Sequence, residues 1–184
     1  MIEMVIDSIR VSLMNYQRVV ILKEKWGERF LPIWIGPAEA DAIDIGLQEV
    51  ALERPLTHDL LHSVIHDLGA TVSSIVVNDL TNDVFRGRII LETKDKHLEI
   101  DSRPSDAIAL AVRVTAPIYA EESVLDKAGI ILDGDSSKIT AQPKTAEDGS
   151  PQPAKLNEQD LKRYPAIYDF LNTLDLEDFG KKKS

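Results

Sequence analysis

Residues 101–113 read DSRPSDAIALAVR, and in this stretch polar residues stand directly before an almost wholly apolar run. Residues 107–114 (AIALAVRV) are apolar on nearly every side, and a helix that is apolar all round lies in a protein interior. Pro104 suits the first turn of such a helix, where its missing N–H leaves nothing unsatisfied. The stretch therefore predicts an interior helix that runs from about Pro104 to Thr115 and decides how the rest of the chain packs.

The polar residues before this helix have two interpretations. In the first, Asp106 faces the positive end of the helix dipole, Ser102 and Ser105 bond free amides, and Arg103 pairs with Asp101 or Asp106. In the second, the free amides and the guanidinium together form an anion site suited to a phosphate. Residue spacing does not separate the two, and capping is the commoner arrangement.

The segments on either side predict an α+β domain with a mixed, largely antiparallel sheet and about three helices. Strand-like stretches occur in two groups, at residues 6–14, 17–24 and 29–36, and again at 71–80, 84–93 and 97–101. Two helices separate the groups. Gly36 and Pro37 open the first, whose stripe includes Val50 and Ala51, and Thr57 is the expected N-cap of the second. Residues 116–125 add a short strand and a final helical turn. Because strands and helices do not alternate strictly, a doubly wound fold is excluded.

The chain divides into three parts. We expect the α+β domain to span residues 1–132 and a flexible linker, rich in Pro, Gly and Ser, to span residues 133–155. Residues 156–184 form a short amphipathic helical segment with a basic tip, suited to dock on this chain or on a partner protein.

Charge and composition restrict the function. The chain has 21 basic and 31 acidic residues and a net charge of −10, which repels nucleic acid at long range. It has no cysteine, so thiolate metal sites and disulfides are excluded. The first residues carry acids where a secretory signal needs a basic start, and no window is long and apolar enough to cross a membrane. We therefore expect a cytoplasmic protein that does not bind a membrane.

Three stretches together resemble the bifunctional nuclease domain family: LPIWIGPAEADAI (31–43), RPLTHDLLHSVIHDLGA (54–70) and IDSRPSDAIALAVRVTAPIY (100–119). The resemblance covers residues 1–130. It implies an α+β body that forms a homodimer or a higher homo-oligomer, in a family named for plant members that degrade DNA and RNA. The polar positions that it carries onto this sequence are Glu39, Arg54, Thr57, His58, Asp59, Asp101, Arg103, Ser105, Asp106 and Arg113.

The resemblance implies a hydrolase that cleaves RNA and DNA phosphodiesters with a divalent ion, Mg²⁺ or Mn²⁺, and no organic cofactor. The expected metal ligands are Glu39, Asp59, Asp101 and Asp106. The expected catalytic residues are His58, Asp59, Asp101, Arg103 and Asp106, and the expected substrate-binding residues are Arg54, Arg103, Ser105 and Arg113. The alternative is a non-catalytic oligomeric interaction module that binds an anionic metabolite or a partner protein.

Histidines repeat every four residues in HDLLHSVIH, at His58, His62 and His66, and so share one helix face. HDLLH is close to the zinc motif HExxH, but Asp59 is one methylene shorter than the glutamate that acts as base in that motif. No third zinc ligand is indicated downstream. A solvated histidine stripe is therefore the favoured interpretation.

Overall fold

The computed structural model describes residues 1–11, 17–50, 52–132 and 139–141 of the 184-residue chain. In this part, nine strands form one sheet in the order β6-β5-β4-β7-β1-β2-β3-β8-β9, accompanied by four helices. The strands are β1 (Ile2–Val11), β2 (Arg18–Glu24), β3 (Arg29–Ile35), β4 (Thr71–Thr81), β5 (Val84–Glu92), β6 (His97–Ser102), β7 (Ile118–Ala120), β8 (Ile130–Leu132) and β9 (Ile139–Ala141). The helices are α1 (Pro37–Leu47), α2 (Thr57–Asp67), α3 (Pro104–Val114) and α4 (Glu122–Ala128). The predicted α+β class is confirmed.

The short strand β7 joins two antiparallel halves into one sheet. It pairs antiparallel with β1 and parallel with β4, whereas every other neighbouring pair is antiparallel. Most neighbouring strands within each half are also adjacent in the sequence, and the exception is β3, which pairs with the distant β8. The sheet is therefore mixed and largely antiparallel, as predicted.

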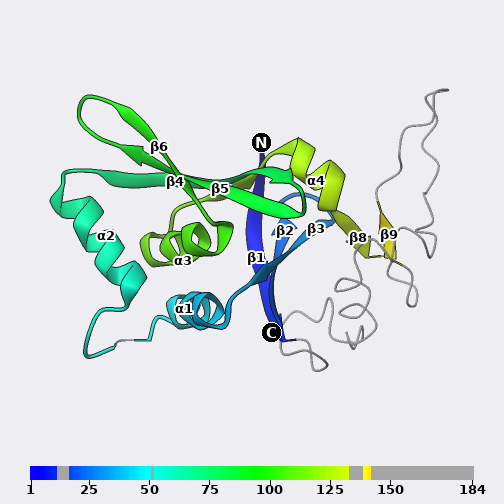
Figure 1. The fold of residues 1–184 in the computed structure, drawn as a ribbon, viewed down its shortest axis with the longest axis horizontal. Coiled ribbons are helices and arrows are strands. Elements are labelled where there is room, and N and C mark those ends of the chain that lie inside the picture. The colour runs from blue at the N-terminus through cyan, green and yellow to red at the C-terminus, as the bar shows by residue number, and fades with distance from the viewer. Residues whose placement is uncertain (12–16, 51, 133–138, 142–184) are drawn as a thin grey trace.

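Helix α3 lies in the centre of the fold. It packs against α1, α2, β4 and β5, and Figure 1 shows it between α1 and the β4–β5 arm of the strongly twisted sheet. Residues 107–111 are all buried, and Ile108 and Leu110 have no exposed surface. The predicted interior helix is confirmed, because only an all-apolar helix can be covered on so many sides.

The limits of α1 and α2 differ in detail from the predicted ones. Helix α1 ends at Leu47 and the chain turns at Glu49, whose φ is 52°, so Val50 lies beyond the helix. The N-cap of α2 is Leu56 rather than Thr57. The reason is that the Asp59 carboxylate accepts a hydrogen bond from the Leu56 amide at 2.7 Å and so caps the helix from inside.

The end of the described chain adds a feature that the sequence did not indicate. Strand β9, at residues 139–141, pairs with β8 and lies within the segment expected to be a linker. The rest of that segment and the helical segment expected at residues 156–184 lie outside the described residues. No helix in the described part is long and apolar enough to span a membrane.

Candidate active site

A close approach between β5 and α3 positions the start of this helix. Strand β6 ends at Ser102, Arg103 is the N-cap residue of α3, and Pro104 is its first helical residue. A Cβ atom at Gly87 on β5 would lie 3.2 Å from the backbone of Pro104 and 3.3 Å from the carbonyl oxygen of Ser102. Because glycine has no Cβ, β5 can pass directly beside this turn and hold Arg103 in place relative to the sheet.

Four polar side chains meet where the first turns of α1, α2 and α3 converge: Glu39, His58, Arg103 and Asp106, hereafter the polar cluster. Arg103 Nη2 donates to Glu39 Oε1 at 2.6 Å, and Arg103 Nε donates to Asp106 Oδ2 at 2.7 Å. A third bond joins Arg103 Nη2 to Asp106 Oδ1 at 3.1 Å. His58 Nε2 lies 3.2 Å from the same Asp106 oxygen. Arg103 thus bridges two carboxylates, and one of these also binds the imidazole.

The polar cluster runs from the interior to the surface. The exposed fractions of the side chains are 10% for His58, 16% for Glu39, 29% for Asp106 and 65% for Arg103. Burial raises the pKa of Asp106, but the hydrogen bonds and charges of Arg103 and His58 outweigh it, so the pKa lies below the ordinary value. The carboxylates of Asp106 and Glu39 raise the pKa of Arg103. Asp106 is therefore ionised at neutral pH.

This arrangement suits proton transfer beside an anion. An ionised carboxylate only accepts hydrogen bonds, so the His58 Nε2 that faces Asp106 carries the hydrogen and Nδ1 is the basic atom. Arg103 uses Nε and Nη2 for its two carboxylates, and its Nη1 has no hydrogen bond within the described residues. Because that group lies on a largely exposed side chain, it is able to donate to a phosphate oxygen.

Asp59 and Arg113 form a second group, separate from the polar cluster. Arg113 Nε donates to Asp59 Oδ1 at 2.5 Å, and Arg113 Nη1 donates to the carbonyl oxygens of Ala42 at 3.1 Å and Ala109 at 2.6 Å. Burial raises the pKa of Asp59. The hydrogen bonds from the Leu56 amide and Arg113 lower this pKa by more than burial raises it, so the pKa lies below its ordinary value. Successive helical residues point about 100° apart, which is why His58 and Asp59 serve different groups.

Arg113, expected to bind substrate, stands in the sequence where a structural ion pair is also indicated. It is the one charge in an otherwise apolar helical run, and a charge in an interior helix needs a buried partner. The sequence does not say which carboxylate is that partner, because Asp59 lies 54 positions away.

The other predicted site residues make no hydrogen bond or ion pair with the polar cluster within the described part of the chain. Asp101 is exposed on β6 opposite Arg88, and it makes no hydrogen bond or ion pair within the described residues, so the partner of Arg103 is Asp106. Ser105 is buried in the first turn of α3. Arg54 and Thr57 are exposed before and at the start of α2.

The repeated histidines of α2 do not act together. His58 is buried against Asp106, whereas the rings of His62 and His66 contact each other edge to face, with centroids 6.5 Å apart. Among residues 1–11, 17–50, 52–132 and 139–141, no three His, Asp or Glu side chains are grouped as metal ligands.

The four carboxylates expected to bind a metal do not fit that role in this arrangement. Glu39 and Asp106 both bind Arg103, and Asp59 binds Arg113 and the Leu56 amide. Asp101 lies on β6, outside the cluster. A divalent ion at Glu39 and Asp106 would have to displace the guanidinium that joins them.

The family model and the named relatives that match this chain point to the same family. Residues 20–133 match the Bifunctional nuclease domain. An uncharacterized protein of Mycobacterium tuberculosis is 40% identical over 136 residues, which cover 74% of this chain and 81% of that protein. Bifunctional nuclease 2 of Oryza sativa subsp. japonica is 27% identical over 115 residues, or 61% of this chain and 35% of the plant protein. Bifunctional nuclease 1 of Oryza sativa subsp. indica is 20% identical over 118 residues, or 62% of this chain and 36% of the plant protein. The match therefore spans about a third of these plant proteins.

Proposed function

Because the chain belongs to the bifunctional nuclease domain family, we propose that it hydrolyses phosphodiester bonds of RNA and DNA, with the polar cluster as its catalytic site. One observation carries this proposal. The first turns of α2 and α3 bring an oriented imidazole and an exposed guanidinium within hydrogen-bond distance of the same ionised carboxylate, and α1 adds a second carboxylate that also binds the guanidinium. Hydrolysis of a phosphodiester needs a proton acceptor for water and a cation for the phosphoryl oxygens.

The chain's own residues supply both parts. Asp106 fixes the His58 tautomer, and His58 Nδ1 takes a proton from the attacking water as the water oxygen bonds to phosphorus. The phosphorus–oxygen bond to the leaving strand then breaks, and the leaving oxygen takes a proton from solvent water. Arg103 keeps its bonds to the two carboxylates and donates from Nη1 to a non-bridging phosphate oxygen. Glu39 holds Arg103 from the second side, so it positions the guanidinium and does not contact the substrate.

Electrostatics set a limit on this activity. The polar cluster has two carboxylates and one guanidinium, and the whole chain carries −10, so long-range attraction does not recruit nucleic acid. We expect weak substrate binding that does not weaken as salt is added, in contrast to the binding of basic nucleases. Mg²⁺ or Mn²⁺ would support the activity without being bound by Glu39 and Asp106, since Arg103 already joins these two carboxylates. Divalent cations screen the repulsion between acidic protein and nucleic acid.

The test is cleavage of 5′-labelled single-stranded RNA and DNA by the full chain, with Mg²⁺, with Mn²⁺ and with EDTA. We expect Asp106→Asn and His58→Ala to lower the rate by about 10²–10⁴, the usual contribution of acid–base catalysis. The matched control is the double variant His62→Ala/His66→Ala, which changes exposed histidines of the same helix and should keep the wild-type rate. Absence of cleavage under every condition, or equal rates in all variants, contradicts the proposal.

A second function is favoured by one surface. Leu60, Val64 and Leu68 form an exposed apolar stripe on α2, and Figure 1 shows α2 at the edge of the molecule with no other described element on its outer side. An unpaired apolar stripe on a helix is typical of an interaction surface. The competing proposal is therefore a non-catalytic oligomeric module, a homodimer or larger, that binds an anionic metabolite or a partner protein. Assembly without cleavage would favour it.

A further inference from the structure

A cavity of about 560 Å³ opens at the other end of α3 from the polar cluster. Its walls are the C-terminal ends of α1 and α3, residues 49, 50 and 52–55 between α1 and α2, and the first turn of α2. A volume of this size is typical of small-molecule sites, which span about 300–1,000 Å³. The lining residues are Ile45, Gly46, Glu49, Val50, Leu52, Glu53, Arg54, Pro55, Asp59, Val112, Arg113 and Thr115.

Arg113 presents a fixed donor to this cavity. Its side chain is only 7% exposed, and Asp59 and the carbonyl oxygens of Ala42 and Ala109 hold it through Nε and Nη1. Its Nη2 has no hydrogen bond within the described residues. Because Arg113 lines the cavity and its guanidinium is already oriented, Nη2 can bind an acceptor with little loss of conformational freedom.

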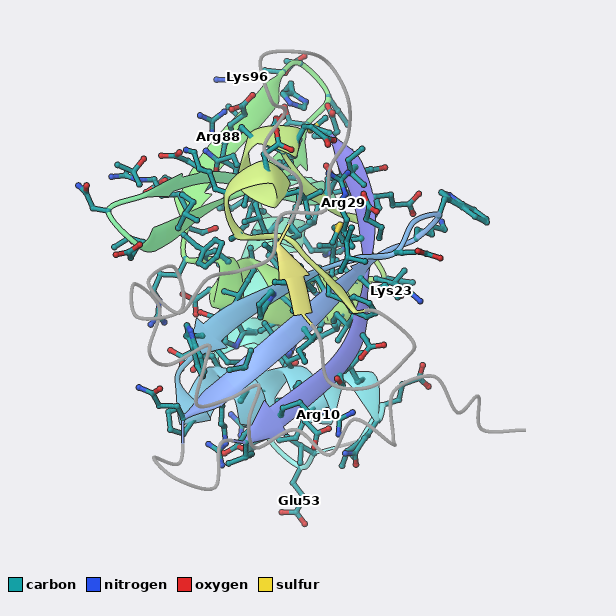
Figure 2. The ribbon with its side chains drawn as sticks, turned by 90° about the vertical axis from the view of Figure 1, so that its right-hand side faces the viewer. Arg10, Lys23, Arg29, Glu53, Arg88 and Lys96 are labelled. Carbon is teal, nitrogen blue, oxygen red and sulfur yellow. The ribbon has the colours of Figure 1, made fainter. Side chains whose placement is uncertain are left out.

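The other charges of the cavity select for more than a simple anion. Arg54 is exposed and makes no ion pair within the described part of the chain, so it supplies a second cation that no carboxylate holds. Glu49 and Glu53 line the same cavity, and Figure 2 shows the end of the Glu53 side chain projecting away from the body. The C-terminal ends of α1 and α3 add partial negative charge. These groups oppose a small anion and favour a ligand that also carries hydroxyl donors.

We propose that this cavity binds a nucleoside monophosphate. The phosphate accepts hydrogen bonds from Arg54 and Arg113 Nη2, and the sugar hydroxyls donate to Glu49. The flat base lies against the apolar wall formed by Ile45, Val50, Leu52, Pro55 and Val112. The ligand is either a free nucleotide or the 5′-phosphorylated end of a strand, which present the same chemistry.

The experiment measures binding of 5′-AMP, adenosine, inorganic phosphate and a 5′-phosphorylated RNA tetramer to the full chain by calorimetry. We expect AMP or the tetramer to bind at least tenfold more tightly than adenosine or phosphate. Arg54→Ala should weaken that binding about tenfold or more, because it removes one charge-assisted contact. Arg86→Ala is the matched control, since it removes an exposed arginine on β5, away from the cavity, and should leave affinity unchanged.

Two further results locate the site. Amide resonances of Gly46 and Thr115, which line the cavity, should shift on addition of the ligand. Asp106→Asn should lower the cleavage rate by about 10²–10⁴ and leave AMP or tetramer binding intact, which separates this inference from the proposed catalysis. Binding of AMP alone identifies a free nucleotide, and binding of the tetramer alone identifies a strand end. The proposal is overturned if neither AMP nor the tetramer binds, or if phosphate binds as tightly as AMP. It is also overturned if Arg54→Ala and Arg86→Ala lose affinity equally.

Discussion

Replacing Arg113 with methionine tests whether its ion pair with Asp59 holds the three large helices together. Arg113 lies in the last turn of α3 and reaches the carbonyl oxygen of Ala42 on α1 and the carboxylate of Asp59 on α2. Methionine keeps much of the apolar stem but none of the donors. The variant therefore removes the polar connection between α1, α2 and α3 with little change in side-chain volume.

The expected loss of stability follows from the bonds that disappear. Three hydrogen bonds from a charged group set an upper limit of roughly 9 kcal/mol, at about 1.5–3 kcal/mol each. The real value is smaller, because the Asp59 side chain is 35% exposed and water can replace the hydrogen bond that it loses with Arg113. We expect Arg113→Met to lower the free energy of unfolding by about 3 kcal/mol. For a domain of this size that corresponds to a fall in Tm of about 12 °C, at roughly 4 °C per kcal/mol.

Urea unfolding followed by circular dichroism measures this difference, with Arg88→Met as the control. Arg88 forms an exposed pair with Glu99 on the β5–β6 arm, where Figure 2 labels it, and its loss should change stability by less than about 0.5 kcal/mol. The double variant Asp59→Asn/Arg113→Met should be at least as stable as Arg113→Met alone, because it removes the uncompensated carboxylate. A cost below about 1 kcal/mol for Arg113→Met, or simple additivity in the double variant, would refute the reasoning.

The pH dependence gives an independent check on the same pair. The pKa of Asp59 in the folded protein is below its ordinary value, so its contribution to stability is complete above about pH 4 and is lost as pH falls through the folded pKa. Without Arg113, this contribution is smaller at neutral pH. The difference in unfolding free energy between wild type and Arg113→Met should therefore shrink in acid, and a constant difference down to pH 2.5 would contradict the assignment.

Three other predictions concern the fold and its assembly. Gly87→Ala should displace the start of α3, because the new Cβ would lie 3.2 Å from Pro104, and should lower both Tm and any cleavage rate; an unchanged Tm with full activity would show that the backbone yields freely. Removing residues 142–184 should shift Tm by no more than about 4 °C, whereas removing residues 133–184 also takes β9 from β8 and should shift it further; equal shifts would mean that β9 adds no stability. The chain should be a dimer or larger by light scattering, and Leu60→Glu/Val64→Glu should make it monomeric if α2 is the interface; a wild-type monomer at tens of micromolar would exclude this assembly.

The polar stretch before α3 shows how far local sequence information reaches. Its residues predict a helix that starts near Pro104, which is confirmed, because the signals for a helix start lie in neighbouring residues. They leave either Asp101 or Asp106 as the partner of Arg103, and the structure shows that the partner is Asp106, three residues later. The strand segments and the α+β class follow from the same local patterns of apolar residues.

The groups that carry the proposed chemistry depend on contacts between distant residues. Arg103 meets Glu39 across 64 positions, and His58 meets Asp106 across 48. The sequence determined that α3 is an interior helix with charges at both ends, since periodicity and capping are encoded by adjacent residues. Only the tertiary structure decided that Asp106 pairs with His58 while Arg113 pairs with Asp59, because two side chains about 100° apart on α2 reach opposite ends of α3 only after the helices have packed.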